Sequence, residues 1–356
     1  MPIYMKVFRV FISLSLLIVF GCGEKKNNDL ISPKASTASV PEDADDCAIW
    51  IHPHDRTLSV IIGNDNQKKG GLYLWDLSGK EIYHTPAIKE PMHVDVRYGM
   101  RLGGERVDIV GCPIRGTNII KIFKIDPDTR TLIDITTIGG IKTGFSDEPY
   151  GFCLYEEKNT GNIYAFLSKN EKGANIHQML LEDDGTGQVK GTLTRSFGGE
   201  FTKSVVECMV ADDELGFVYM ADQEHAVLKF NADPTSETKP VNIFALDDGI
   251  QGNRKGLSIY ECPEGKGYLI LSSQGNSTLK IYERGGTNPF VATIEKKGSD
   301  NEDGLDSTSC AIPPKYPFGF VVCHNQPKKN FVIYSWEDIA KDKLIKCSGS
   351  CVRKNL

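Results

Sequence analysis

The sequence lacks two features that would point to particular partners. Its 47 aspartate and glutamate residues outnumber 41 lysine and arginine residues, the net charge is −6, and no basic stripe follows any predicted element. A nucleic-acid partner is therefore not expected. The apolar run from Val10 to Phe20 is too short for a transmembrane helix, which needs roughly 20 residues. With 40% hydrophobic and 25% charged residues, the composition is that of an ordinary globular protein.

The short apolar run fits an N-terminal export signal. Lys6 and Arg9 precede it, which is the charge asymmetry of a secretion signal. It ends in VFGC, which resembles the lipobox of bacterial lipoproteins, although a plain signal peptide cut nearby is an alternative. We therefore expect a signal peptide with a lipobox over residues 1–22, lipidation at Cys22 and a flexible tether over residues 23–40. The exported protein would then meet the membrane of the cell envelope only through this anchor.

Cysteine occurs ten times, but not in the pattern of a disulfide framework. Without Cys22 the number is odd, and isolated strand cysteines usually act as small buried hydrophobic residues. The isolated ones are Cys47, Cys112, Cys153, Cys208, Cys262, Cys310 and Cys323. Only Cys347 and Cys351 are close enough in sequence to suggest a local bridge, and they could equally stay free.

The segment 267–286, GYLILSSQGNSTLKIYERGG, predicts the repeating unit of the fold. An apolar run, a polar group and a segment of alternating polarity indicate a β-hairpin with a polar corner. The return strand recurs about every fifty residues, at 71–76, 119–126, 176–182, 226–231, 278–283 and 330–336. Six such copies predict an all-β fold, a six-bladed β-propeller. A β-sandwich gives no reason for six matched repeats.

We place the propeller at residues 41–345 and a C-terminal tail at 346–356. Propellers commonly close a blade with strands from both ends of the chain. We therefore expect a strand near Ala35 to Val40 to complete the sixth blade. The protein is expected to be a monomer.

Three consecutive hairpin corners carry a cation, at Lys68, Arg115 and Lys169. Equivalent corners of neighbouring blades lie side by side at one mouth of a propeller, so these cations should converge. Phosphate suits such a site, because arginine offers a planar fork of donors and lysine a compact charge. For each residue taken alone, a solvated surface cation is the alternative.

Acidic residues cluster in two places. Glu42, Asp43, Asp45 and Asp46 directly precede a predicted strand, and the loop 299–306 reads SDNEDGLD. Hard cations such as calcium prefer oxygen ligands, so both segments could bind calcium. A solvated turn explains the first equally well, and a plain exposed loop explains the second.

Together these motifs resemble the β-propeller phytases, the calcium-dependent alkaline phytases. The matching segments run in the same order over most of the chain: DDCAIW, KKGGL, VDVRY, DEPYGF, VADDELG, GKGYLILSSQGNSTLKIYERGG, and EDGLD followed by YPFGF. The resemblance implies calcium ions at one mouth and hydrolysis of phosphomonoesters of inositol phosphates, such as inositol hexakisphosphate. In that family a calcium-bound water attacks phosphorus without a covalent phosphoenzyme.

The same resemblance assigns site residues. Lys68, Arg115, Tyr150 and Lys169 fall on phosphate-contacting positions, and Asp303 lies in the acidic loop that faces substrate. Metal-binding positions are matched by Asp45, Asp46, Glu207 and Gln274.

The departures concentrate in the half of the motif that holds metal. Gln223 stands where the family has a second glutamate, Asn253-Arg254-Lys255 replaces Asp-x-Glu, and His93 replaces an amide. Lys255 would repel a nearby calcium by several kcal/mol, on the order expected for adjacent charges near a surface. Two functions therefore stay open. One is a phytase with fewer calcium ions, in which Lys255 supplies part of the missing charge. The other is a non-catalytic propeller that binds a polyanion or a protein partner.

Overall fold

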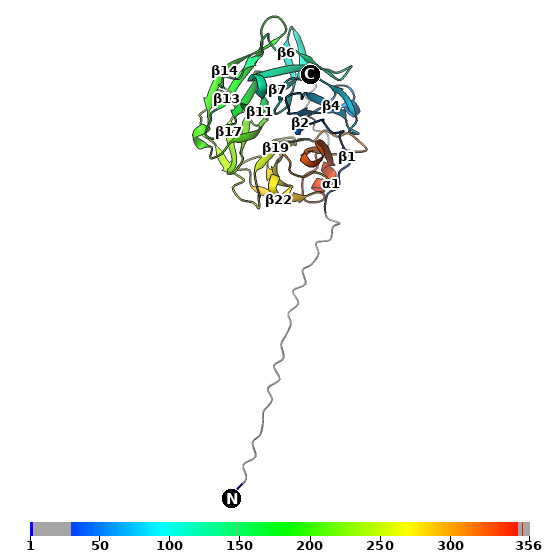
Figure 1. The fold of residues 1–356 in the computed structure, drawn as a ribbon, viewed down its shortest axis with the longest axis vertical. Coiled ribbons are helices and arrows are strands. Elements are labelled where there is room, and N and C mark those ends of the chain that lie inside the picture. Colours follow the sequence, from blue (N-terminus) through cyan, green and yellow to red (C-terminus); the bar gives the residue numbers. More distant parts are fainter. Residues whose placement is uncertain (3–29, 147, 348–350, 352–356) are drawn as a thin grey trace.

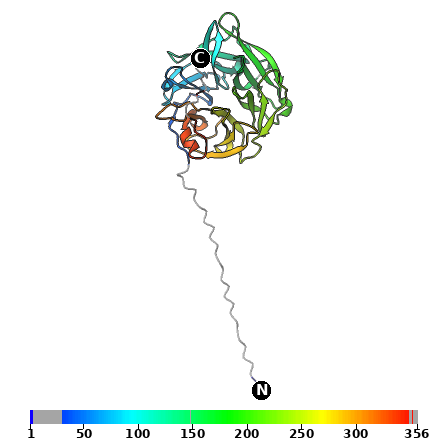
Figure 2. The same ribbon diagram turned by 180° about the vertical axis from the view of Figure 1, so that it is seen from behind.

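Six antiparallel sheets surround one axis in the computed structural model, which describes residues 1–2, 30–146, 148–347 and 351 (Figure 1). The view from behind shows the same ring (Figure 2). The six-bladed β-propeller predicted from the repeats is confirmed. Cys22 and the predicted lipobox lie outside the described residues. No helix within the described ranges is long and apolar enough to cross a membrane.

Each blade is one sheet. The strand given first for each blade below faces the axis, because these six strands contact one another around the ring. Blade one holds β2 (Ala44–Trp50), β3 (Val60–Asp65), β4 (Leu72–Asp76) and β5 (Glu81–His84). Blade two holds β6 (Asp95–Leu102), β7 (Glu105–Ile114), β8 (Ile119–Asp126), β9 (Thr131–Asp134) and β10 (Ile141–Lys142). Blade three holds β11 (Pro149–Glu156), β12 (Ile163–Lys169), β13 (Ile176–Asp183) and β14 (Val189–Phe197).

The other three blades repeat the pattern. Blade four holds β15 (Val206–Asp212), β16 (Phe217–Asp222), β17 (Ala226–Asn231) and β18 (Asn242–Phe244). Blade five holds β19 (Arg254–Glu261), β20 (Gly267–Ser273), β21 (Thr278–Glu283) and β22 (Phe290–Glu295). Blade six holds β23 (Leu305–Thr308), β24 (Phe320–Asn325), β25 (Asn330–Ser335) and β1 (Ala35–Ser36). Short 3₁₀ turns lie at 56–58, 115–117, 199–201, 274–276 and 326–328, and the helix α1 spans Trp336–Ala340.

The predicted polar hairpin is the turn between β20 and β21. Its 3₁₀ turn ends at Ser277, which takes the left-handed conformation with φ 51°. The same turn recurs in blades two and six, where Asn118 and Lys329 have φ 53° and 51°. Blades two, five and six therefore share one corner geometry.

Hydrophobic contact between blades holds the ring together. Six apolar clusters fill the six interfaces between neighbouring blades. The sheets are therefore covered on both faces, and the middle strands read as nearly continuous apolar runs. Every residue of β3 and β20 is buried.

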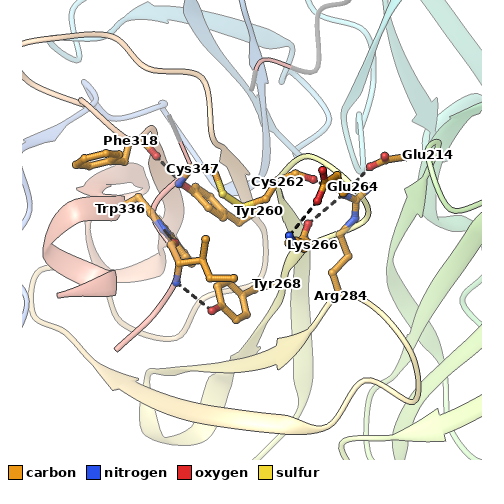
Figure 3. Close-up of a disulfide and its surroundings, with 11 residues drawn as sticks. Glu214, Tyr260, Cys262, Glu264, Lys266, Tyr268, Arg284, Phe318, Trp336 and Cys347 are labelled. Carbon is orange, nitrogen blue, oxygen red and sulfur yellow. Dashed lines mark hydrogen bonds and ion pairs between the residues drawn. A yellow bond between two sulfur atoms is a disulfide. The ribbon is translucent and has the colours of Figure 1, made fainter. Parts of the chain in front are cut away.

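Both ends of the chain close the ring. Strand β1 pairs with β25 through Ala35 and Ile333, which confirms the expected closing strand. After β25, the ring of Trp336 stacks on Tyr260 of blade five with centroids 3.7 Å apart (Figure 3). The chain then reaches Cys347, whose backbone N–H donates to the Tyr260 hydroxyl at 3.4 Å.

Cys347 and Cys351 neither bond to each other nor stay free, the two alternatives that the sequence left open. Cys347 bonds to Cys262 (Figure 3), and Cys351 bonds to Cys310. The reason is topological, because the tail folds back across blades five and six and meets cysteines distant in sequence. Cys262 and Cys310 are therefore not the isolated residues expected. The other strand cysteines are free and buried as predicted: Cys47, Cys112, Cys153, Cys208 and Cys323.

Candidate active site

The inner strands carry β-bulges at matching positions near one mouth of the propeller. The strand register shifts where residues 45–46, 150–151, 207–208 and 255–256 each face a single residue of the second strand. Blade two shows the same shift around His93, between the Pro91–Ile114 bridge and the Asp95–Gly111 pair. An extra residue bends a strand and re-aims its side chains, and bulges are enriched beside active sites.

Side chains from four of these bulges meet Asp303, from the loop before β23, in one ionic ring. We define this ring as Asp45, Tyr150, Glu207, Lys255 and Asp303. The Lys255 Nζ atom contacts Glu207 Oε2 and lies 3.6 Å from Asp303 Oδ1. The Tyr150 hydroxyl is hydrogen-bonded to Glu207. Asp45 is electrostatically coupled to both Glu207 and Asp303. Five blades thus contribute one side chain each.

Burial sets the protonation of this ring. It raises the pKa of Asp45 to about 7; His93 opposes that shift, and the nearby Asp303 and Glu207 carboxylates add to it. Burial also raises the pKa of Tyr150, and Glu207 raises it further. For Lys255, burial opposes the charged form, but Glu207 and then Asp303 outweigh it and raise the pKa. The ring therefore contains a protonated tyrosine and a protonated lysine at neutral pH.

Asp46 turns away from this ring toward blade two. Its Oδ2 accepts a hydrogen bond from Val94 N at 3.1 Å and lies 3.1 Å from His93 Nδ1. A Cβ atom on Gly304 would lie 2.1 Å from Asp46 Oδ1, so only glycine lets the loop that carries Asp303 approach this closely. Asp46 therefore joins blades one, two and six.

Gln223 and Gln274 occupy equivalent corners and hold the two carboxylates that Lys255 bridges. Each backbone N–H donates to the residue just before the inner strand of its blade, Val205 O and Asn253 O, both at 3.1 Å. The Gln274 Nε2 atom donates to Asp303 Oδ1 at 2.8 Å, and Gln223 Nε2 donates to Glu207 Oε2. Both amides therefore act as donors to acids.

The three predicted cations lie at consecutive corners but not at one shared position. We define the corner position by this backbone hydrogen bond. In blade two it is Arg115, whose backbone N–H donates to Glu90 O at 3.0 Å. In blades one and three it is held by Asn66 and Asn170, bonded to Asp43 O at 2.9 Å and Glu148 O at 3.1 Å. Lys68 therefore lies two residues after the corner position of its blade, and Lys169 lies one residue before that of its own, because the corners differ in length.

These cations form a rim separate from the ionic ring. Arg115 Nε lies 3.8 Å from Glu90 Oε2 with about a third of its side chain exposed. The Lys169 Nζ atom contacts Glu171 Oε2 at 2.6 Å, and Lys68 is exposed. All three lie at the corners between the second and third strands, at the same end of the blades as the bulges.

The sequence reading missed His324, which fixes Asp303. Its Nδ1 accepts a hydrogen bond from Asp303 N at 3.1 Å. Together with Lys255 it overcomes burial and lowers the pKa of Asp303. Ser168 Oγ and Asn64 Oδ1 accept bonds in the same way from the bulge residues Gly151, at 2.7 Å, and Asp46, at 2.8 Å. Aligning the second strands of the repeats would have revealed this acceptor position.

The loop 299–304 that carries Asp303 is held by a buried ion pair. Glu302 and Lys296 are in contact and almost fully inaccessible to solvent. The Ser299 hydroxyl donates to Glu302 Oε1 at 2.9 Å, and Lys296 Nζ donates to Ser277 O at 3.0 Å. Glu302 is thus neutralised by Lys296. We expected either a calcium turn or a plain exposed loop here, and neither includes a buried ion pair.

Among the described residues, no group of three or more histidine, cysteine, aspartate or glutamate side chains is arranged to hold a metal ion. Glu207 and Asp303 are engaged by Lys255, and Asp46 is engaged by blade two. Asp45 is different, since its Oδ2 is buried with no hydrogen-bond partner. This oxygen is free to bind a cation, whereas Glu207 and Asp303 are already paired with Lys255.

Comparison with known proteins identifies the family. The phytase family model matches residues 10–347. The chain is 38% identical over 322 residues to the 3-phytase of Bacillus subtilis (strain 168), covering 85% of this chain and 82% of that protein. Among solved structures, the β-propeller domain of Cps50 (Swd1) from Myceliophteria thermophila matches at 12% identity with a TM-score of 0.48, covering 84% of this chain and 85% of that one. The family match and the Bacillus relative establish that this chain belongs to the phytase family of phosphoric monoester hydrolases.

Proposed function

We propose that this chain hydrolyses phosphomonoesters of inositol phosphates at the mouth of its propeller and that it requires calcium. Its family and the 3-phytase activity named for the Bacillus relative support the substrate class. The observation that carries the proposal is the convergence of Asp45, Tyr150, Glu207, Lys255 and Asp303 from five blades, next to a cationic rim.

The rim is suited to hold the substrate. Arg115 offers a fork of donors, and Lys68 and Lys169 offer compact charges that can pair with several phosphates of one polyanion. Inside the ring, Glu207 is held by Tyr150, Gln223 and Lys255, so its carboxylate is fixed before substrate arrives. Fixed dipoles and charges of this kind stabilise a transition state without reorganising during the reaction.

The calcium requirement rests on Asp45. Its buried, unpartnered Oδ2 would hold the ion, and the carboxylate would then be paired instead of carrying an uncompensated buried charge. When bound, calcium would supply Lewis acidity, which draws charge from phosphate oxygens and makes a water molecule more acidic. One such ion is fewer than the resemblance to the alkaline phytases led us to expect.

The test is phosphate release from inositol hexakisphosphate by the purified protein, with millimolar calcium and with chelator. We expect release that needs calcium and is abolished by chelator, with circular dichroism showing that the protein stays folded. Absence of release under both conditions from a folded protein would reject hydrolysis. Calorimetric binding of the same compound without turnover would then favour a polyanion-binding propeller.

A further inference from the structure

Lys255 supplies the positive charge that offsets two carboxylates of the ionic ring. It comes from the bulge of β19, and only 11% of its side chain is exposed. Its ammonium lies between the carboxylates of Glu207 and Asp303, which belong to blades four and six. It therefore joins the blades on either side of its own.

We propose that the Lys255 ammonium is the resident cation of the mouth and takes the place between Glu207 and Asp303 that a divalent ion would otherwise fill. Neither carboxylate is then a calcium ligand in the native protein. The choice of calcium as the ion rests on the proposed function, but the placement of the ammonium does not.

The hydrogen bonds around these carboxylates support the proposal. Glu207 receives donors from Tyr150, Gln223 and Lys255, and Asp303 receives Gln274 Nε2 at 2.8 Å with the ammonium 3.6 Å away. A divalent ion would have to displace these donors and would also be repelled by the ammonium. A carboxylate has about four lone-pair sites, so little acceptor capacity is left on Glu207.

The loop 299–304, which carries Asp303, contains a second pairing of a carboxylate with a lysine. Glu302, directly before Asp303, is neutralised by the buried ammonium of Lys296. Two consecutive acidic residues of one loop are therefore balanced by lysines supplied by the chain. Chelators cannot remove such cations, so the position of Asp303 does not depend on free metal.

Substitution of Lys255 separates this role from simple packing. In Lys255→Gln the two carboxylates face each other without a cation, so the protein should become less stable in chelator and gain a calcium site. We expect calorimetry to count one more calcium ion per molecule than in the wild type. Calcium should also raise the melting temperature by roughly 5 °C or more beyond the rise seen in the wild type. Lys255→Arg, which keeps the charge, should bind calcium like the wild type.

A second variant tests the native protein without disturbing the lysine. Glu207→Gln should bind the same number of calcium ions as the wild type. Loss of one ion in Glu207→Gln would overturn the proposal, as would a Lys255→Gln protein that folds but gains no calcium. These are binding readouts, so they hold even if no phosphate is released and the proposed hydrolysis fails.

Discussion

The ionic ring and the cluster around Arg284 both gather acids around one cation, yet they are built differently. Arg284 is fully buried and makes two short bonds to Asp212, at 2.6 and 2.7 Å. It also reaches Glu214 at 3.0 Å, drawn in Figure 3, and two backbone carbonyls at 3.2 Å each. In the ring, by contrast, the buried Asp45 Oδ2 and the Nε2 atoms of His93 and His324 nearby have no partner.

The difference separates a structural cluster from a binding site. A planar guanidinium matches carboxylates in one fixed geometry and leaves the Arg284 cluster nothing to bind. The Lys255 ammonium is a compact charge that balances two acids and leaves a third unpaired. Buried polar atoms without a partner are costly. Three of them lie at or beside the ring, whereas every guanidinium nitrogen of Arg284 has a partner.

Removing the structural cation should have the largest effect. Arg284→Met leaves Asp212 buried without its partner, and we expect a loss of roughly 3–5 kcal/mol in the free energy of unfolding. Urea denaturation followed by fluorescence measures it. Lys266→Met is the matched control, because Lys266 pairs with Glu264 in an exposed bridge at 2.9 Å. Its cost should stay below about 1 kcal/mol. Equal losses in the two variants would contradict the contrast.

Substitution of two arginines of blade two should separate binding from stability. Arg97 is paired with Asp95 at 3.1 Å and also with Asp213 at 2.9 Å. Arg115 belongs to the rim. Arg115→Ala should raise KM for inositol hexakisphosphate roughly 10- to 100-fold, as expected for loss of a hydrogen bond to a charged group. Arg97→Ala should change KM little and instead lower the melting temperature. A similar rise in KM for both would remove Arg115 from the binding site.

A third prediction concerns how stability depends on pH around Asp306. Burial raises the pKa of Asp306 to about 7, and Asp95 adds to the shift. Between about pH 4 and 7 the folded protein keeps this proton and the unfolded chain releases it. Asp306 therefore makes stability fall as pH rises, by up to about 1.4 kcal/mol per pH unit.

Asp306→Asn should flatten that fall, measured by denaturant unfolding at several pH values. Asp213 also has a pKa raised to about 7, first by burial, so some slope should remain. Asp300→Asn, at an exposed residue of the loop before β23, should leave the slope unchanged. An unchanged slope in Asp306→Asn would mean that this carboxyl stays ionised when the protein is folded.

The sequence alone determined the fold and the family. Strand alternation is a local property that recurs with every blade, so six copies could be counted without knowing how the blades meet. The motifs around Asp45, Tyr150, Glu207 and Asp303 pointed to residues that the structure brings into one ring.

Tertiary structure alone decided how these residues are paired. Lys255 contacts Glu207 and Asp303, each 48 residues away in the sequence, because the inner strands of three neighbouring blades begin close together around one axis. The shift of Lys68 and Lys169 from the Arg115 position depends on corner lengths, which the repeat pattern averages over. The disulfides of Cys347 and Cys351 depend on where the tail folds back. Local patterns define strands and blades, whereas partners in space are set by the closure of the whole ring.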